Sequence, residues 1–149
     1  MDPPSTLGRL APPLVPEGLA DAPTSLPARS PFFRLAWRSM ELAERAAVTG
    51  DLARAEEAFL IAAHGFGNSG LPWLEGLATL ALAAVYRLEG FDLPDWIVDR
   101  PSALTVAPDV ADLFLDILVL IDITPPDSHF LWELLADVRA HRKGLERSA

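Results

Sequence analysis

Hydrophobic residues recur every three or four positions through most of the chain after residue 29, which is the spacing of a helix with one buried face. No segment shows the strict alternation of apolar and polar residues that is typical of a half-buried strand. The pattern therefore predicts an all-α domain over residues 30–149, built as a five-helix bundle or as a short array of helix pairs.

Capping and turn residues delimit the first two helices. Ser30 and Pro31 suit a helix N-terminus, and Gly50 suits its end because glycine readily adopts the left-handed conformation that closes a helix. Asp51 is a typical N-cap for the second helix. Residues 64–70 are rich in glycine and other turn residues and predict a break after that helix. The polar face predicted for the first helix consists of Arg34, Arg38, Glu41, Glu44 and Arg45.

A third helix is predicted from Pro72 to about Glu89, and its middle is apolar on every side. A helix of this kind is buried on more than one side, so we expect it at the centre of the bundle. Residues 90–107 contain two further prolines and predict an irregular connection, with one short turn around Trp96.

The fourth helix has two apolar faces. It begins at Pro108-Asp109 and ends before Thr124-Pro125-Pro126, and Asp127 or Ser128 then caps a last helix. The primary stripe consists of Val110, Leu113, Phe114, Ile117, Leu118 and Ile121, and the second face of Leu115, Val119 and Leu120. Since one face is enough to bury the helix, the second is a candidate contact surface for a protein partner or a second copy.

Three aspartates also share one face of the fourth helix. Asp109, Asp112 and Asp116 are spaced i, i+3 and i+7. They are candidates for binding a basic partner or a cation, and the alternative is the solvated stripe of an otherwise buried helix. Trp96 and Ile97 in the irregular connection are further candidate partner-binding residues, with Trp96 either a surface anchor or a plug over the core.

Residues 1–29 differ from the rest of the chain. Half of the fourteen prolines lie here, and proline removes a backbone donor and restricts the backbone, so helix and sheet are not expected. Aliphatic residues nevertheless recur at Leu7, Leu10, Leu14, Val15, Leu19 and Leu26. We expect an extended arm that lies over a groove of its own domain or of a neighbouring subunit.

Composition narrows the classes of function. The chain has 149 residues, no cysteine and a formal net charge of −9. Thiolate chemistry is therefore excluded, and the negative field makes nucleic acid and anionic membranes unfavourable partners. No apolar run approaches the ~20 residues of a spanning helix, and no signal peptide is expected. We predict a cytoplasmic protein without membrane insertion.

Charge is unevenly distributed along the chain. Residues 91–127 contain eight aspartates and a single arginine, whereas residues 139–147 contain four lysines and arginines and one glutamate. An acidic belt and a basic end suit head-to-tail contact or a tethered partner. The alternative is that the cations only complement the dipole of the last helix.

Residues 42–62 carry a recognisable pattern of small residues, a Gly-Asp turn and a packed phenylalanine. The pattern consists of Leu42, Ala43, Gly50, Asp51, Leu52, Ala55, Phe59 and Ala62. It resembles one tetratricopeptide repeat, and a weaker second half-repeat follows at Leu82, Ala83, Tyr86 and Gly90. The 40 residues from Gly50 to Gly90 depart from the family's repeat of about 34. The resemblance implies a helical hairpin.

A second resemblance involves residues 50–57 (GDLARAEE) and 74–81 (LEGLATLA). These segments are similar to a small bacterial helical family of unknown function with the motif G-x-[YF]-x-x-A-H-E followed by a leucine-rich helix. Glu57 matches the glutamate of the motif, and Glu56 replaces its histidine. A metal or acid–base role of that histidine and glutamate would therefore be half lost in this chain.

No catalytic, cofactor-binding or metal-ligating residues are predicted. His64, His129 and His141 are not spaced as a metal-ligand set. The glycines of residues 65–70 spell G-x-G-x-x-G, but the motif follows a helix and not a strand, which excludes a dinucleotide site.

These features favour a non-enzymatic protein-interaction or assembly module, such as a subunit or adaptor of a larger complex. A groove between the first three helices, or the second face of the fourth, would take a protein partner or a second copy. The alternative is a small metal-dependent or acid–base enzyme that uses Glu57, Glu75 and His64, near the turn between the second and third helices.

Overall fold

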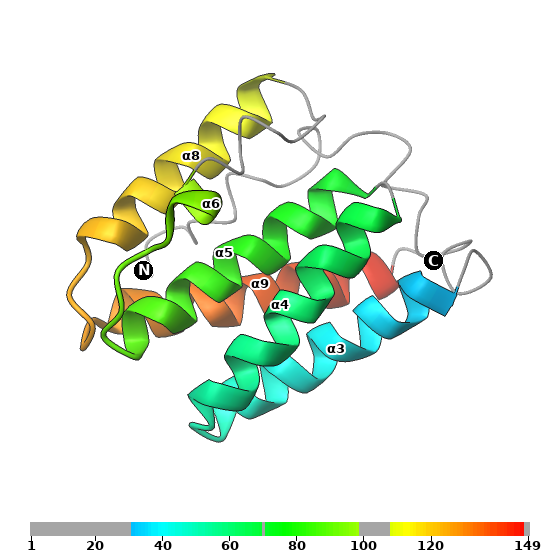
Figure 1. Ribbon diagram of the computed structural model, residues 1–149, viewed down its shortest axis with the longest axis horizontal. Coiled ribbons are helices and arrows are strands. Elements are labelled where there is room, and N and C mark those ends of the chain that lie inside the picture. The colour runs from blue at the N-terminus through cyan, green and yellow to red at the C-terminus, as the bar shows by residue number, and fades with distance from the viewer. Residues whose placement is uncertain (1–30, 70, 99–107, 148–149) are drawn as a thin grey trace.

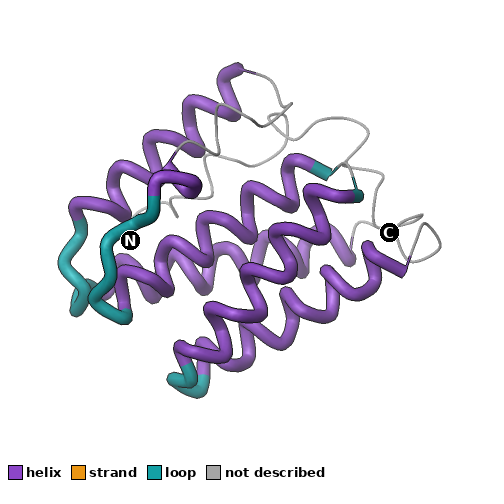
Figure 2. Tube along the Cα trace, viewed as in Figure 1, coloured by secondary structure: helices purple, strands orange, loops and turns teal. Residues whose placement is uncertain are grey.

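The computed structural model describes residues 31–69, 71–98 and 108–147. In these residues the chain forms a bundle of helices, and no strand occurs among them (Figure 2). The helices are α3 (Pro31–Val48), α4 (Leu52–Asn68), α5 (Pro72–Leu88), α6 (Asp95–Val98), α8 (Pro108–Ile123) and α9 (His129–Arg147). The predicted all-α class is confirmed, whereas the arm predicted at residues 1–29 lies outside the described residues.

Helices α3 and α4 form the predicted hairpin, and its turn is closed as the sequence suggests. Gly50 has a φ of 85°, and the amides of Gly50 and Asp51 donate to the carbonyls of Ala47 and Ala46 at 3.1 and 2.8 Å. This pair of bonds is the usual closure of a helix that ends in a left-handed glycine. The Asp51 carboxylate then accepts from the amide of Arg54 at 3.3 Å and caps α4.

The break predicted at residues 64–70 is wrong, because α4 continues to Asn68. The glycines of this run serve close packing. An ideal Cβ at Gly65 would lie 2.7 Å from the Ala36 Cβ, and one at Gly67 would lie 2.6 Å from a carboxylate oxygen of Glu75. The missing side chains let α4 approach its neighbours closely, and this packing outweighs the weak helix propensity of glycine.

Helix α5 is the centre of the bundle, as its uniformly apolar sequence predicts. It packs against α4, α8 and α9, which lie around it in Figure 1. Trp73, Leu77 and Leu80 are buried along it. The polar residue in its middle, Thr79, donates its hydroxyl hydrogen to the Glu75 carbonyl at 2.8 Å, so its burial leaves no donor unsatisfied.

Helix α8 is held against α5 by an aromatic side chain. The ring of Phe114 is buried and lies edge-on to Trp73, with ring centroids 5.6 Å apart. It also lies against the backbone of Gly76, where an ideal Cβ would be 2.6 Å from the ring Cζ. The described part of the predicted primary stripe is buried at Phe114, Ile117, Leu118 and Ile121.

Helix α9 closes the bundle against α5 and α3. Of the two predicted caps, Ser128 is the one used, because its Oγ accepts from the amide of Phe130 at 3.2 Å. The inner stripe of α9 is buried at Leu131, Leu134, Leu135 and Val138. Among the described residues, none of the helices combines the length and the apolar character that crossing a membrane requires.

A buried ion pair connects α3 and α9. The Arg142 guanidinium donates from Nε and Nη2 to the two carboxylate oxygens of Glu44, both at 2.7 Å, and both side chains are almost fully buried. The Arg142 guanidinium also lies 5.1 Å from the centre of the Trp37 ring. The solvent-facing position predicted for Glu44 is therefore wrong, since the carboxylate is buried together with a bidentate arginine.

Candidate functional site

The outer side of α8 exposes several aliphatic side chains. Leu115, Val119 and Leu120 are 40, 51 and 42% exposed, which agrees with the predicted second apolar face. Ile123, one turn beyond Val119 and not included in that prediction, is 70% exposed. Several exposed aliphatic side chains together on one helix are typical of a contact surface.

Carboxylates are interspersed among these aliphatic residues. Asp112, Asp116 and Asp122 are exposed, and within the described residues none of the three is in an ion pair. The side chain of Asp109, the remaining member of the predicted aspartate set, lies outside the described residues. We name the exposed set of Leu115, Val119, Leu120, Ile123, Asp112, Asp116 and Asp122 the α8 face.

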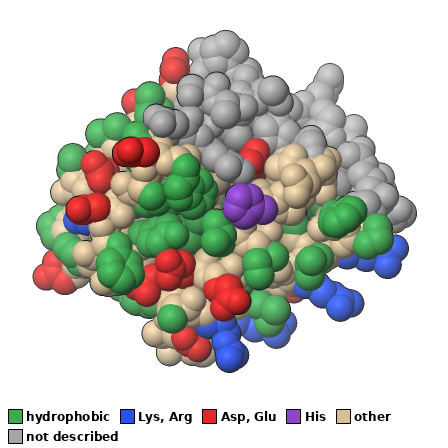
Figure 3. Space-filling view, viewed as in Figure 1, with side chains coloured by type: hydrophobic (Ala, Val, Ile, Leu, Met, Phe, Trp, Pro, Cys, Tyr) green, Lys and Arg blue, Asp and Glu red, His purple; other side chains and the backbone are tan. Residues whose placement is uncertain are grey.

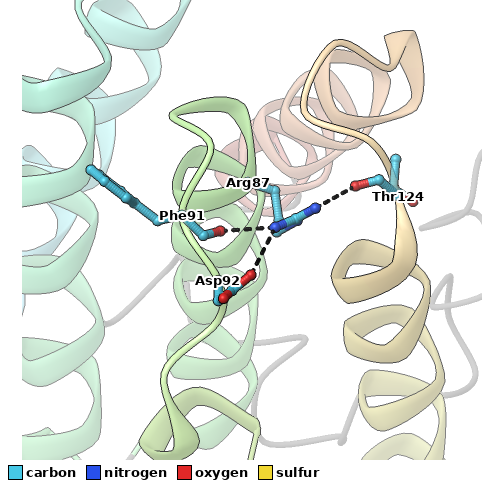
Figure 4. Close-up of polar contacts among 4 residues, drawn as sticks. All are labelled: Arg87, Phe91, Asp92 and Thr124. Carbon is cyan, nitrogen blue, oxygen red and sulfur yellow. Dashed lines mark hydrogen bonds and ion pairs between the residues drawn. The ribbon is translucent and has the colours of Figure 1, made fainter.

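Arg87 fixes the C-terminal end of α8 to the end of α5 (Figure 4). Its Nη2 donates to the Thr124 carbonyl at 3.1 Å, just after α8 ends. Its Nη1 donates to the Phe91 carbonyl at 3.1 Å and to Asp92 Oδ1 at 3.5 Å. One guanidinium thus joins α5, the following loop and α8, so the α8 face is presented on a fixed helix.

Trp96 and Ile97 of α6 differ in their surroundings. Trp96 is 38% exposed and stacks on His64 of α4, with ring centroids 6.3 Å apart. Ile97 is fully buried, so its predicted place in a partner-binding surface is corrected to a place in the core. His64 lies within α4, which continues to Asn68.

A concave surface lies between α3 and α9. This α3–α9 groove has a volume of about 380 Å³ and is lined mainly by apolar side chains. Its lining consists of Glu44, Ala47, Val48, Phe59, Trp132, Leu135, Ala136, Arg139, Ala140 and Lys143. Trp132 and Val48 are exposed along it. The sequence did not predict this groove, since it depends on how far α9 separates from α3.

The α3–α9 groove is cationic. The carboxylate of Glu44, its one acidic lining residue, is neutralised by Arg142 through the buried ion pair. Arg139 and Lys143 line the same groove, and neither is paired with a carboxylate in the part of the chain that the structure describes. The groove therefore combines an apolar lining with two unneutralised cations.

A second, smaller groove lies between α3 and α4. It has a volume of about 300 Å³, and its lining is almost entirely apolar. Phe32, Leu35 and Ile61 line it and are exposed, and His64 lies at the same groove. This groove lies between the first two helices only, whereas the predicted groove lies between the first three, and its lining contains no lysine or arginine.

The three residues of the enzyme alternative do not converge. The Glu75 carboxylate lies against Gly67, whereas Glu57 precedes Gly67 by ten residues of α4, which is about 15 Å along a helix. His64 stacks on Trp96. Among the described residues, no group of three or more potential ligands is arranged to hold a metal ion.

A different pair of carboxyl groups does meet. Burial raises the pKa of Glu89, and the charge of Glu56 and a hydrogen bond to it raise this pKa further. Burial and Glu56 likewise raise the pKa of Tyr86. Glu56 lies on α4, and Tyr86 and Glu89 lie at the end of α5, far from the predicted turn.

The chain has no match among protein-family models, curated proteins or solved structures. The tetratricopeptide resemblance and the resemblance to the small bacterial helical family therefore stay predictions from the sequence. Residues 42–62, which carry the tetratricopeptide pattern, lie on the hairpin of α3 and α4, whereas the two segments of the second resemblance lie mainly on α4 and α5.

Proposed function

We propose that this chain is a non-enzymatic protein-interaction module, acting as a subunit or adaptor of an assembly, and that the α8 face is its contact surface. The observation that supports the proposal is the exposure of Leu115, Val119, Leu120 and Ile123 on a helix whose other side is fully packed. Four aliphatic side chains in water on one helix are stabilised by a partner that covers them.

The charges of the α8 face define the chemistry of the partner. Three exposed carboxylates at Asp112, Asp116 and Asp122 lie among the aliphatic residues. A complementary surface has an apolar stripe with lysine or arginine beside it, because opposite charges steer association and fix the register of the contact. We propose a helical surface of this kind as the partner, bound by helix-to-helix packing.

The test is a binding experiment with a matched control. The purified chain is used to retain proteins from an extract of its host, each retained protein is identified, and binding is then measured with purified components. Val119→Lys places a charge in the middle of the α8 face, and Leu42→Lys does the same at an exposed leucine of α3. We expect Val119→Lys to weaken binding at least tenfold and Leu42→Lys to leave it unchanged.

Equal affinity of the wild-type chain and Val119→Lys for the identified partner would contradict the proposal. Because Val119 is half exposed, the substitution leaves the fold intact, and a thermal unfolding curve that coincides with that of the wild type verifies this.

A further inference from the structure

We infer that the partner of the α8 face is a second copy of this chain, which receives α8 in its α3–α9 groove. The inference rests on the proposed function of the α8 face and identifies the surface that it binds. It is supported by the shapes, the apolar residues and the charges of the two surfaces, and by their places in the bundle.

The two surfaces match in shape and spacing. Leu115, Val119 and Ile123 follow one another every four residues and form a ridge along α8. The α9 wall of the groove has the same spacing at Trp132, Ala136 and Ala140. Ridges with four-residue spacing pack into grooves of the same spacing, which is the commonest class of helix packing. The alanines leave room for the larger aliphatic side chains of the ridge.

The apolar residues on both sides are exposed in the single copy. Ile123 is 70% exposed on the ridge, and Val48 is 69% exposed in the groove. Contact between the two surfaces removes both from water, and burial of apolar area stabilises association by about 25 cal/mol per Å² before the entropy lost on binding.

The charges of the two surfaces are opposite. Asp112 and Asp116 are unpaired on the α8 face, and Arg139 and Lys143 are unpaired in the groove, within the part of the chain that the structure describes. Since the whole chain has a formal net charge of −9, two copies repel each other over most of their surfaces. The cationic groove is a place where the acidic α8 of another copy is attracted.

The two surfaces lie on different sides of the bundle. In Figure 1, α8 and α3 are at opposite edges, with α4 and α5 between them. On the face shown in Figure 3, most lysine and arginine side chains gather along α3, whereas acidic side chains are spread over the rest. A contact between unlike surfaces is head-to-tail, so each bound copy retains one free α8 face or one free groove and the assembly grows beyond a dimer.

Two blocking variants test this geometry. Val119→Lys blocks the α8 face and leaves the groove intact, while Ala140→Glu places a carboxylate in the groove at an exposed helical position and leaves α8 intact. The molar mass in solution is measured by light scattering and sedimentation from about 1 µM to about 1 mM, the range in which small interfaces associate. Leu42→Lys serves as the control.

The expected results follow from head-to-tail contact. The wild-type chain and Leu42→Lys form assemblies larger than a dimer as concentration rises, and high salt weakens them. Each blocking variant alone associates at least tenfold more weakly. An equimolar mixture of the two forms a dimer and nothing larger, because one intact α8 face meets one intact groove.

Other outcomes would overturn the inference. A dimer of Ala140→Glu alone would show that two α8 faces meet each other, and a mixture that stays monomeric would show that the groove does not receive α8. A wild-type chain that is monomeric up to about 1 mM would also contradict it. The proposed function would survive that last result if a different protein bound the α8 face and lost affinity in Val119→Lys.

Discussion

Helices α5 and α8 are both largely apolar, but their surroundings in the structure differ. Both are apolar on more than one side, but the sequence predicts only α5 to be buried within the domain on more than one side and leaves the second face of α8 as a candidate contact surface. The structure surrounds α5 with α4, α8 and α9, whereas α8 packs mainly against α5 and keeps its second apolar side in water. An apolar character on all sides of a helix thus indicates that other residues cover it. It does not indicate whether those residues belong to the same chain or to a partner.

Charged residues in the middle of a helix distinguish the two cases. The charged residues of α5, Glu75 and Arg87, lie in its first and last turns. Helix α8 has Asp112, Asp116 and Asp122 along its length, and all three are exposed. Since a carboxylate is not buried without a partner, aspartates within an apolar helix mark the side that the rest of the domain leaves open.

The largest expected difference between α5 and α8 is in the free energy of unfolding lost when a leucine is replaced by alanine. Leu80 of α5 is 1% exposed and Leu120 of α8 is 42% exposed. We expect Leu80→Ala to lower the free energy of unfolding by about 2 to 5 kcal/mol, through lost burial and a cavity. Leu120→Ala should lower it by about 1 kcal/mol or less. Urea denaturation monitored by circular dichroism measures both, and equal losses would mean that α8 is covered within the single chain.

Gly76 allows α5 and α8 to pack closely, so a larger residue at this position should push the two helices apart. In Gly76→Ala the new methyl group would lie within 3.0 Å of the Phe114 ring, so the ring and α8 must move. We expect a loss of about 1 to 3 kcal/mol in the free energy of unfolding. Gly144→Ala is the control, since a Cβ there meets nothing within 4 Å, and it should stabilise α9 by ~0.5 to 1 kcal/mol. Equal effects of both substitutions would refute this account of Gly76.

The fixed end of α8 depends on Arg87. Arg87→Gln removes the bond from Nη2 to the Thr124 carbonyl, and we expect a loss of ~1 to 2 kcal/mol. Hydrogen exchange should accelerate in the last turn of α8 and not in the middle of α5. Arg54→Gln is the control, because its ion pair with Asp51 is exposed and contributes ~0.5 kcal/mol or less. Unchanged exchange in α8 would show that this helix is held by packing alone.

The smallest expected effect is on the pH dependence of folding stability, to which Glu89 at the end of α5 contributes. The pKa of Glu89 is raised above 4.5 in the folded chain, so the folded state holds this proton more tightly than the unfolded state. Stability is therefore lost as pH rises from about 4.5 through the raised pKa. Glu89→Gln should remove this loss and gain ~0.5 kcal/mol at neutral pH. Urea denaturation across this pH range measures it, and an identical gain in Glu57→Gln would contradict the assignment to Glu89.

The sequence predicted the helices well because residues close to each helix end determine where the helix begins and ends. The Gly50 turn, the Asp51 cap and the prolines after α8 act within a few residues, and the structure has each of them where expected. Residues 64–70 were misjudged because the role of Gly65 and Gly67 depends on side chains of other helices. Local turn propensity contains no information about such close approach.

The candidate site was predictable only in part for the same reason. The second face of α8 follows from periodicity, and Leu115, Val119 and Leu120 are exposed as it requires. The buried position of Glu44 was missed, although its neighbours Ala43, Ala46 and Ala47 were a signal that this part of α3 is packed. Its partner Arg142 is far away in the sequence, so the pairing could not be deduced from spacing.

The ion pair of Glu44 and Arg142 has a consequence for the order in which the chain folds during synthesis. Its two residues are 98 positions apart, so at about 5 to 20 residues per second Arg142 is made roughly 5 to 20 s after Glu44. The hairpin of α3 and α4 depends on local contacts and forms early. The Glu44 carboxylate, however, stays hydrated until its arginine emerges, and α3 therefore completes its packing only when α9 has left the ribosome.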